Sequence, residues 1–99
     1  VDYVDINGTL VFPILTDDVG GEAVAADAPP TYDILSADQT SVLVNDAATT
    51  ALSGRTGAYK VSQSITAALG FAAGNTYTLI ADWEINSSAR HKAYTFKVT

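Results

Sequence analysis

The sequence predicts an all-β fold, a single sandwich of two antiparallel sheets, and three observations support this prediction. About seven short segments alternate apolar and polar residues, which is the period of a half-buried strand. Turn residues separate these segments about every 8–12 positions, and no segment has the period of a convincing helix. The 99 residues are enough for one compact domain, so we expect residues 1–99 to form one unit.

The first predicted strand runs from Gly8 to Thr16. Its alternation places Leu10, Phe12 and Ile14 on one face, which we expect to point toward the core. Pro13 lacks an amide hydrogen and cannot donate to a neighbouring strand. The strand is therefore predicted to lie at a sheet edge or to contain a bulge.

A short edge strand and two further strands are predicted in the middle of the chain. A long, acidic and glycine-rich loop comes first, with a short edge strand around residues 22–25. Proline favours extended neighbours, so the segment after the loop predicts a strand with Tyr32 and Ile34 on one face. Residues 41–45 predict a short strand, and the polar residues 46–57 predict a connection.

The last part of the chain predicts a strand, a crossing loop and a hairpin. Residues 58–66 alternate strictly, and residues 67–74 predict a crossing loop with one helical turn because two glycines disfavour a helix. Residues 76–85 predict a central strand, joined by a tight turn to a final strand over residues 90–99. The positions predicted to face inward are Tyr59, Val61, Ile65, Tyr77, Leu79, Ala81, Trp83, Tyr94, Phe96 and Val98.

Charge and composition exclude several classes of partner. Eleven acidic residues against five basic ones give a net charge of −6, which repels nucleic-acid phosphates and anionic membranes. The absence of cysteine excludes disulfides and thiolate metal sites. No apolar run approaches the roughly 20 residues of a membrane span, and the start lacks a signal-peptide layout. We therefore expect a soluble protein that binds neither nucleic acid nor membrane.

Such a succession of strands is the immunoglobulin-like architecture, and Tyr77 is placed to form the tyrosine corner of that fold. In this motif the phenol hydrogen-bonds to backbone a few residues upstream and fixes the crossover between the sheets. Phe71 is predicted to cap the core below the ring, and Gly74 to allow a close approach of the loop. The spacing of these three residues resembles the same corner in fibronectin type III domains, with Ala73 in place of the usual proline. The alternative is a tyrosine that only fills a strand face.

A wider resemblance covers most of the chain. Pro30 precedes a Tyr-x-Ile strand, residues 56–59 open another, and the tyrosine corner precedes a terminal hairpin. This order resembles the small immunoglobulin-like modules of tailed-bacteriophage head-decoration, tail and fibre proteins, although residues 86–88 stand where a glycine is expected. The resemblance implies a non-enzymatic structural component of a virion, which contacts other capsid or tail proteins in multiple copies. It implies no catalytic residue and no cofactor.

The single histidine and the acidic loop are the remaining candidates for site chemistry. His91 lies on the outward face of the last strand between Arg90 and Lys92, so we interpret it as a solvated residue and not as a catalytic base. The acidic residues of the long loop after the first strand could supply oxygen ligands for calcium. Their spacing matches no EF-hand loop, and a solvated acidic loop is the alternative. The calcium candidates are Asp17, Asp18, Glu22 and Asp27.

Aromatic residues of the predicted hairpin suggest a second function. Trp83, with Tyr94 as its expected cross-strand neighbour, could form a platform on which a sugar stacks. Because Trp83 shares a face with core positions, packing in the interior is the favoured interpretation. The alternative function is a carbohydrate-binding or cell-surface-binding module of a larger extracellular bacterial protein.

Apolar residues outside the core indicate where a protein partner would bind. In the first strand, Val11 and Leu15 face away from the core. The loop that follows adds Val19, Glu22 and Val24 as further contact candidates.

Overall fold

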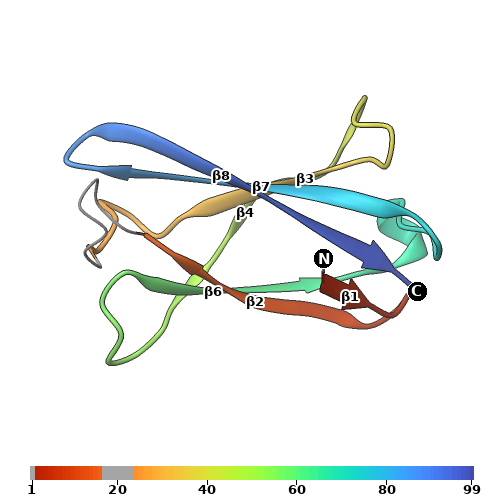
Figure 1. The fold of residues 1–99 in the computed structure, drawn as a ribbon, viewed down its shortest axis with the longest axis horizontal. Coiled ribbons are helices and arrows are strands. Elements are labelled where there is room, and N and C mark those ends of the chain that lie inside the picture. Colours follow the sequence, from red (N-terminus) through yellow and green to blue (C-terminus); the bar gives the residue numbers. More distant parts are fainter. Residues whose placement is uncertain (1, 17–23) are drawn as a thin grey trace.

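The structure, a computed structural model, describes residues 2–16 and 24–99, and its strands form two facing sheets (Figure 1). The larger sheet has the order β1-β8-β7-β3-β4 and the smaller one has the order β2-β6-β5. The predicted all-β sandwich is confirmed. The strands are β1 (Asp2–Val4), β2 (Thr9–Leu15), β3 (Thr31–Leu35), β4 (Val42–Ala48), β5 (Thr50–Ala51), β6 (Ala58–Ser64), β7 (Thr76–Ile85) and β8 (Ser88–Val98).

The strand order is that of an immunoglobulin-like sandwich. Strands β2, β6 and β5 take the places of strands B, E and D, while β3, β7 and β8 take those of C, F and G. Strand β4 extends the larger sheet beyond β3, in the way that strand C′ extends the sheet of variable-type domains. The chain therefore reaches this topology without a disulfide between the sheets.

One pair of strands departs from the expected antiparallel pairing. Strand β1, which the sequence did not reveal, lies parallel to β8 with Tyr3 opposite Lys97 and Val4 opposite Val98. Three residues are too few for the alternating pattern to identify a strand. Its pairing ties the start of the described chain to the end, and Figure 1 shows the two ends side by side.

The core lies between the sheets and is built by the faces that alternation predicts. Strand β7 is central, with β8 on one side and β3 on the other, as predicted. Ile34, Val61 and Leu79 are fully buried, and the Tyr32 hydroxyl reaches Gln63 Oε1 at 2.7 Å across the interior. The predicted helical turn is present as a short 3-10 helix, Ala67–Leu69. No helix among the described residues is long and apolar enough to cross a membrane.

Residues 46–57, predicted as a connection, are only partly irregular. Strand β4 continues to Ala48, because the Asp46 amide donates to Asp33 Oδ1 at 2.7 Å and the backbone of Asp46 takes a φ of 49°. Thr49 is buried and its hydroxyl donates to the Pro30 carbonyl oxygen, after which β5 begins in the opposite sheet. A bulge and one buried threonine thus take the chain from one sheet to the other.

Strand β2 lies at the edge of the smaller sheet, and Pro13 occupies a position suited to that edge. The Thr16 amide donates to the Gly57 carbonyl oxygen at 2.7 Å. Because ladder bonds recur at every second residue, Ile14 and Phe12 also point their backbone groups toward β6. Pro13 therefore lies among the residues whose backbone faces away from β6, where a missing amide hydrogen breaks no ladder bond.

The hairpin between β7 and β8 has a turn of two residues. Ile85 pairs with Ser88, and the intervening Asn86 and Ser87 have φ values of 51° and 65°. Two successive positive φ values define the type I′ turn that matches the twist of a hairpin. Glycine, which was expected here, is the usual second residue of this turn, so serine holds the conformation at some cost.

Candidate interaction surface

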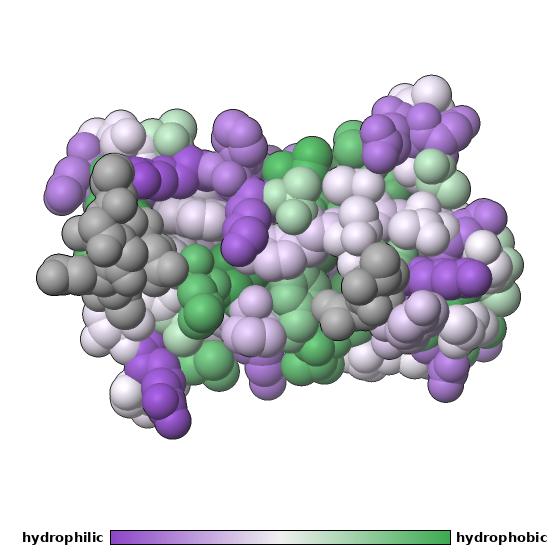
Figure 2. Space-filling view, in the orientation of Figure 1, coloured by the Kyte–Doolittle hydropathy of each residue, from purple (hydrophilic) through white to green (hydrophobic). Residues whose placement is uncertain are grey.

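The outer face of β2 exposes a row of apolar side chains. Val11 is 56% exposed and Leu15 is 57% exposed, and the exposed ring of Pro13 lies between them. Leu10 and Ile14 on the opposite face are buried. The alternation of side chains along the strand therefore places Val11, Pro13 and Leu15 on the outer face. Figure 2 shows apolar surface over the middle of β2. We name Val11, Pro13 and Leu15 the β2 row.

The neighbouring strand surrounds the β2 row with small polar groups and one positive charge. Pro13 pairs with Lys60 and Val11 pairs with Ser62, and the side chains of both β6 residues are exposed. Strands β2, β5 and β6 contain no acidic residue, although the whole chain carries a net charge of −6. The outer face of this sheet therefore carries an apolar strip beside one lysine and no carboxylate from its strands, and partner proteins bind surfaces of this kind.

A buried junction supports the end of the β2 row. The Thr16 hydroxyl lies 2.6 Å from the Val24 carbonyl oxygen and 3.2 Å from the Gly57 carbonyl oxygen. The Val24 amide donates to the Thr16 carbonyl oxygen at 3.0 Å. These bonds fix residues 16 and 24 next to each other directly after Leu15. Of the loop candidates, Val24 is half-buried at this junction, whereas Val19 and Glu22 lie outside the described residues.

The second half of the predicted edge strand around residues 22–25 is not a strand in the structure. Val24 and Ala25 have no strand conformation, and residues 22 and 23 lie outside the described part of the chain. The hydrogen bonds of Val24 go to Thr16 of the same loop, and the Ala26 amide donates to the Tyr59 hydroxyl at 3.1 Å. Local bonds to β2 and β6 thus replace sheet pairing in this segment.

Asp27, a calcium candidate, uses its carboxylate to hold the hairpin turn. One oxygen accepts the Asn86 amide at 3.0 Å and the other accepts the Ser87 amide at 2.8 Å. The Asp27 amide also donates to the Glu84 carbonyl oxygen. The other candidates, Asp17, Asp18 and Glu22, lie outside the described residues, and no group of three possible metal ligands occurs within residues 2–16 and 24–99.

We expect the change Asp27→Ala to lower the free energy of unfolding by about 1 kcal/mol, the usual effect of losing a carboxylate cap on backbone amides. Urea denaturation measures the loss, and hydrogen exchange at Asn86 and Ser87 should accelerate. Glu84→Gln is the matched control, since it removes a negative charge from the same hairpin without removing a turn acceptor. Equal exchange rates in Asp27→Ala and the parent protein would contradict this role.

A shallow hollow of about 360 Å³ lies between the loop before β3, the middle of β7 and the start of β8. Asp82, Glu84 and His91 line it together with Trp83 and Arg90. His91 lies exposed, directly opposite Asp82, in agreement with its predicted outward face. Burial and the negative charge of Asp33 raise the pKa of Asp82, while His91 acts in the opposite direction. The hollow thus collects acceptors and donors suited to a small polar molecule.

Trp83 is not the exposed platform that sugar stacking requires. Its side chain is partly buried and packs against the core, and its Nε1 atom is shielded from solvent. The prediction of Tyr94 as its cross-strand neighbour is wrong, because the two-residue turn pairs Trp83 with Arg90 and places Tyr94 opposite Leu79. Tyr94 instead packs on Phe12, with ring centroids 5.1 Å apart.

The tyrosine corner residues lie together at the opposite end of the sandwich. The Ala72 amide donates to the Tyr77 hydroxyl at 2.8 Å, five residues upstream. Phe71 contacts the Tyr77 ring edge-on, with centroids 5.0 Å apart. Gly74 has a φ of 93° and open space where a Cβ would lie, so the turn conformation requires glycine and close packing does not. The expected reason for this glycine, a close approach of the loop, is therefore corrected.

Comparisons of the chain with models of protein families, with curated proteins and with solved structures find no match. The surfaces and contacts of the chain itself are therefore the basis for its function.

Proposed function

We propose that this chain is a non-enzymatic structural component of a bacteriophage virion, part of a capsid decoration or of a tail or fibre. It acts by burying the outer face of its smaller sheet against another virion protein. The resemblance to phage immunoglobulin-like modules suggests the setting. The single observation that carries the mode of action is the β2 row, with two large aliphatic side chains more than half exposed.

The composition around the β2 row favours protein contact over other uses. An apolar strip flanked by hydroxyl groups and one lysine offers packing area and few groups with a strong need for water. Pro13 removes a backbone donor from the edge beside the strip, so a partner gains more from the side chains than from strand pairing. In a symmetric assembly many copies of a weak contact add up through avidity.

The proposal predicts that the protein occurs at stoichiometric copy number in purified phage particles, which quantitative mass spectrometry measures. The changes Val11→Glu and Leu15→Glu should release it from particles, because burying an unpaired carboxylate is unfavourable. Both side chains are exposed, so the thermal unfolding temperature should stay near that of the parent. Thr95→Glu, on the outer face of the larger sheet, is the matched control and should remain particle-bound. Absence of the parent protein from particles would overturn the proposal.

The hollow lined by His91 favours a second candidate, carbohydrate binding by a module of an extracellular bacterial protein. Its carboxylates and imidazole can bond to sugar hydroxyls, although the buried edge of Trp83 offers no stacking face there. A glycan array separates the two candidates. Enrichment of one sugar, lost in both His91→Ala and Glu84→Gln and kept in Leu15→Glu, would favour the second.

A further inference from the structure

Strand β8 has an edge that is open over most of its length. It is the longest strand among the described residues, and β7 pairs with it along one side from Ser88 to Lys97. On the other side β1 pairs only with residues 96–98. Within the described chain, residues 88–95 therefore have no strand on that side. We name this segment the open edge of β8.

The register shows which backbone groups are free at the open edge. The Val98 amide donates to the Asn75 carbonyl oxygen of the neighbouring segment, and the Thr99 amide donates to Val4 on β1. Because the two sides alternate along a strand, the odd-numbered residues point their backbone away from β7. Among residues 2–16 and 24–99, no strand pairs with the outward-pointing N–H and C=O groups of Ala89, His91 and Ala93. Two of the three are alanines, so the outer side of the edge presents little steric obstacle.

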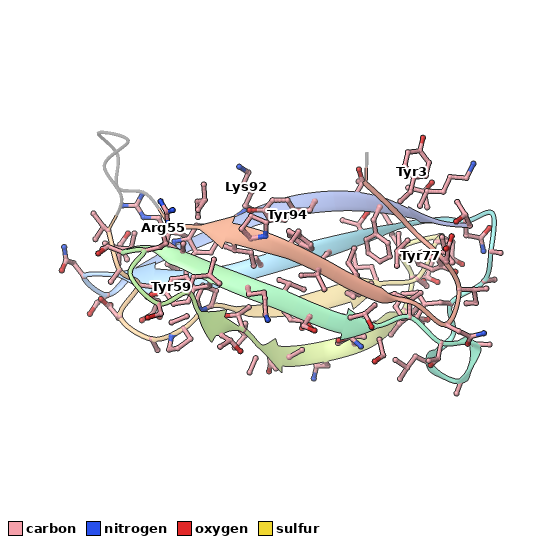
Figure 3. All side chains as sticks on the ribbon, turned by 90° about the horizontal axis from the view of Figure 1, so that it is seen from below. Tyr3, Arg55, Tyr59, Tyr77, Lys92 and Tyr94 are labelled. Carbon is pink, nitrogen blue, oxygen red and sulfur yellow. The ribbon has the colours of Figure 1, made fainter. Side chains whose placement is uncertain are left out.

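The inward-facing side chains of the same segment are basic and aromatic. Arg90, Lys92 and Tyr94 share the face that Phe96 and Val98 turn toward the core. The Lys92 ammonium lies 5.5 Å from the centre of the Tyr94 ring, and Figure 3 shows the two side chains next to each other. Two of the five basic residues of an acidic chain are therefore placed two positions apart on one strand edge.

Arg90 has an unsatisfied donor. Its Nε atom is buried and has no hydrogen-bond partner among the described residues. The same is true of the Nε1 atom of Trp83, which lies opposite Arg90 on β7. A buried donor without an acceptor is unfavourable, and a charged donor more so. An incoming carboxylate would supply the opposite charge beside the guanidinium group of Arg90.

We propose that the open edge of β8 binds an extended acidic segment of a partner protein by strand addition. The backbone of the segment pairs with Ala89, His91 and Ala93. Its acidic side chains, two positions apart, contact Arg90 and Lys92, and an apolar side chain two positions further on packs on Tyr94. A second copy of β8 is a poor occupant because it brings the same positive charges. This surface is separate from the β2 row, and the inference does not depend on the virion proposal.

Inward-pointing charges on an edge strand also have a protective use, since they oppose pairing with any other strand. The two explanations differ in their dependence on charge. Protection predicts that no extended peptide binds the parent protein, whereas the proposal predicts selective binding of an acidic one.

The experiment titrates isotope-labelled protein with blocked peptides and follows its amide resonances. The first peptide has threonine at every second position and, between the threonines, two glutamates followed by a valine. Lysine replaces both glutamates in the second, and glutamine in the third. The proposal predicts saturable shifts at Ala89, His91 and Ala93 with the glutamate peptide, and binding weaker by about tenfold or more with the other two.

Two variants and one control complete the test. Lys92→Glu, an exposed position, should remove the preference for the glutamate peptide, because each charged peptide then meets one opposite and one like charge on the edge. Ala93→Pro, which removes an edge amide and spares the ladder with β7, should weaken the glutamate peptide without loss of fold. Lys60→Glu on the other sheet should change nothing. No saturable shift in the parent protein, or a preference that Lys92→Glu leaves unchanged, would overturn the proposal.

Discussion

Tyr77→Ala is expected to lower the free energy of unfolding by about 3–5 kcal/mol, the usual effect of removing a buried aromatic ring. Tyr77 is only 2% exposed, and its ring contacts Phe71 and Phe96 at centroid distances of 5.0 and 5.8 Å. Removal of the ring leaves a cavity at the crossover between the sheets, because the surrounding structure relaxes only partly. Urea denaturation followed by tyrosine and tryptophan fluorescence measures the change.

Tyr77→Phe separates the hydroxyl from the ring. This variant keeps the aromatic contacts and leaves the Ala72 amide without its acceptor, so a loss of about 1–2 kcal/mol is expected. Tyr3→Phe is the matched control, because Tyr3 is 68% exposed, and it should unfold like the parent protein. If Tyr77→Phe were as stable as Tyr3→Phe, the ring alone would hold the crossover and the role of the corner bond would be wrong.

Gly57→Ala is expected to cost about 3 kcal/mol, from two sources of similar size. Gly57 has a φ of 75°, which is unfavourable for alanine, and a Cβ there would lie 2.9 Å from the carbonyl oxygens of Thr16 and Val24. The Thr16 oxygen accepts the Val24 amide and the Val24 oxygen accepts the Thr16 hydroxyl, so neither oxygen moves without weakening the junction after β2. Thermal unfolding measures the loss.

Gly54→Ala provides an unusually close control for this prediction. Gly54 has nearly the same φ, 76°, but no atom lies within 4 Å of the position of a Cβ. It should therefore lose only the conformational part, about 1 kcal/mol. Equal losses in the two variants would show that the contacts with Thr16 and Val24 do not matter.

The sequence predicted those features of the fold that depend on alternation over several residues. The inward faces of β2, β3, β6 and β7 follow directly from the period of two, and Pro13 correctly indicated an edge. Strand β1 and the short β5 were missed because three and two residues carry no detectable period. The place of β1 also depends on a partner at the far end of the given sequence, which a local pattern does not contain.

The site residues likewise fall into those that local alternation predicts and those that depend on distant contacts. The exposure of Val11 and Leu15 followed from the face that each occupies, whereas the contact of Asp27 with the hairpin turn joins residues about sixty positions apart. A signal was nevertheless present. The two central amides of a two-residue hairpin turn need acceptors, and an aspartate in a nearby loop is a suitable one. The open edge of β8 required the pairing of β1, so the sequence alone did not reveal it.

The parallel pairing of β1 with β8 also bears on how the chain folds. Residues 2–4 pair with residues 96–98, so these contacts have nearly the greatest separation that the given sequence allows. A high contact order of this kind is associated with folding in milliseconds to seconds. Until that closure forms, residues 96–98 lack the partner strand that covers this edge of the larger sheet.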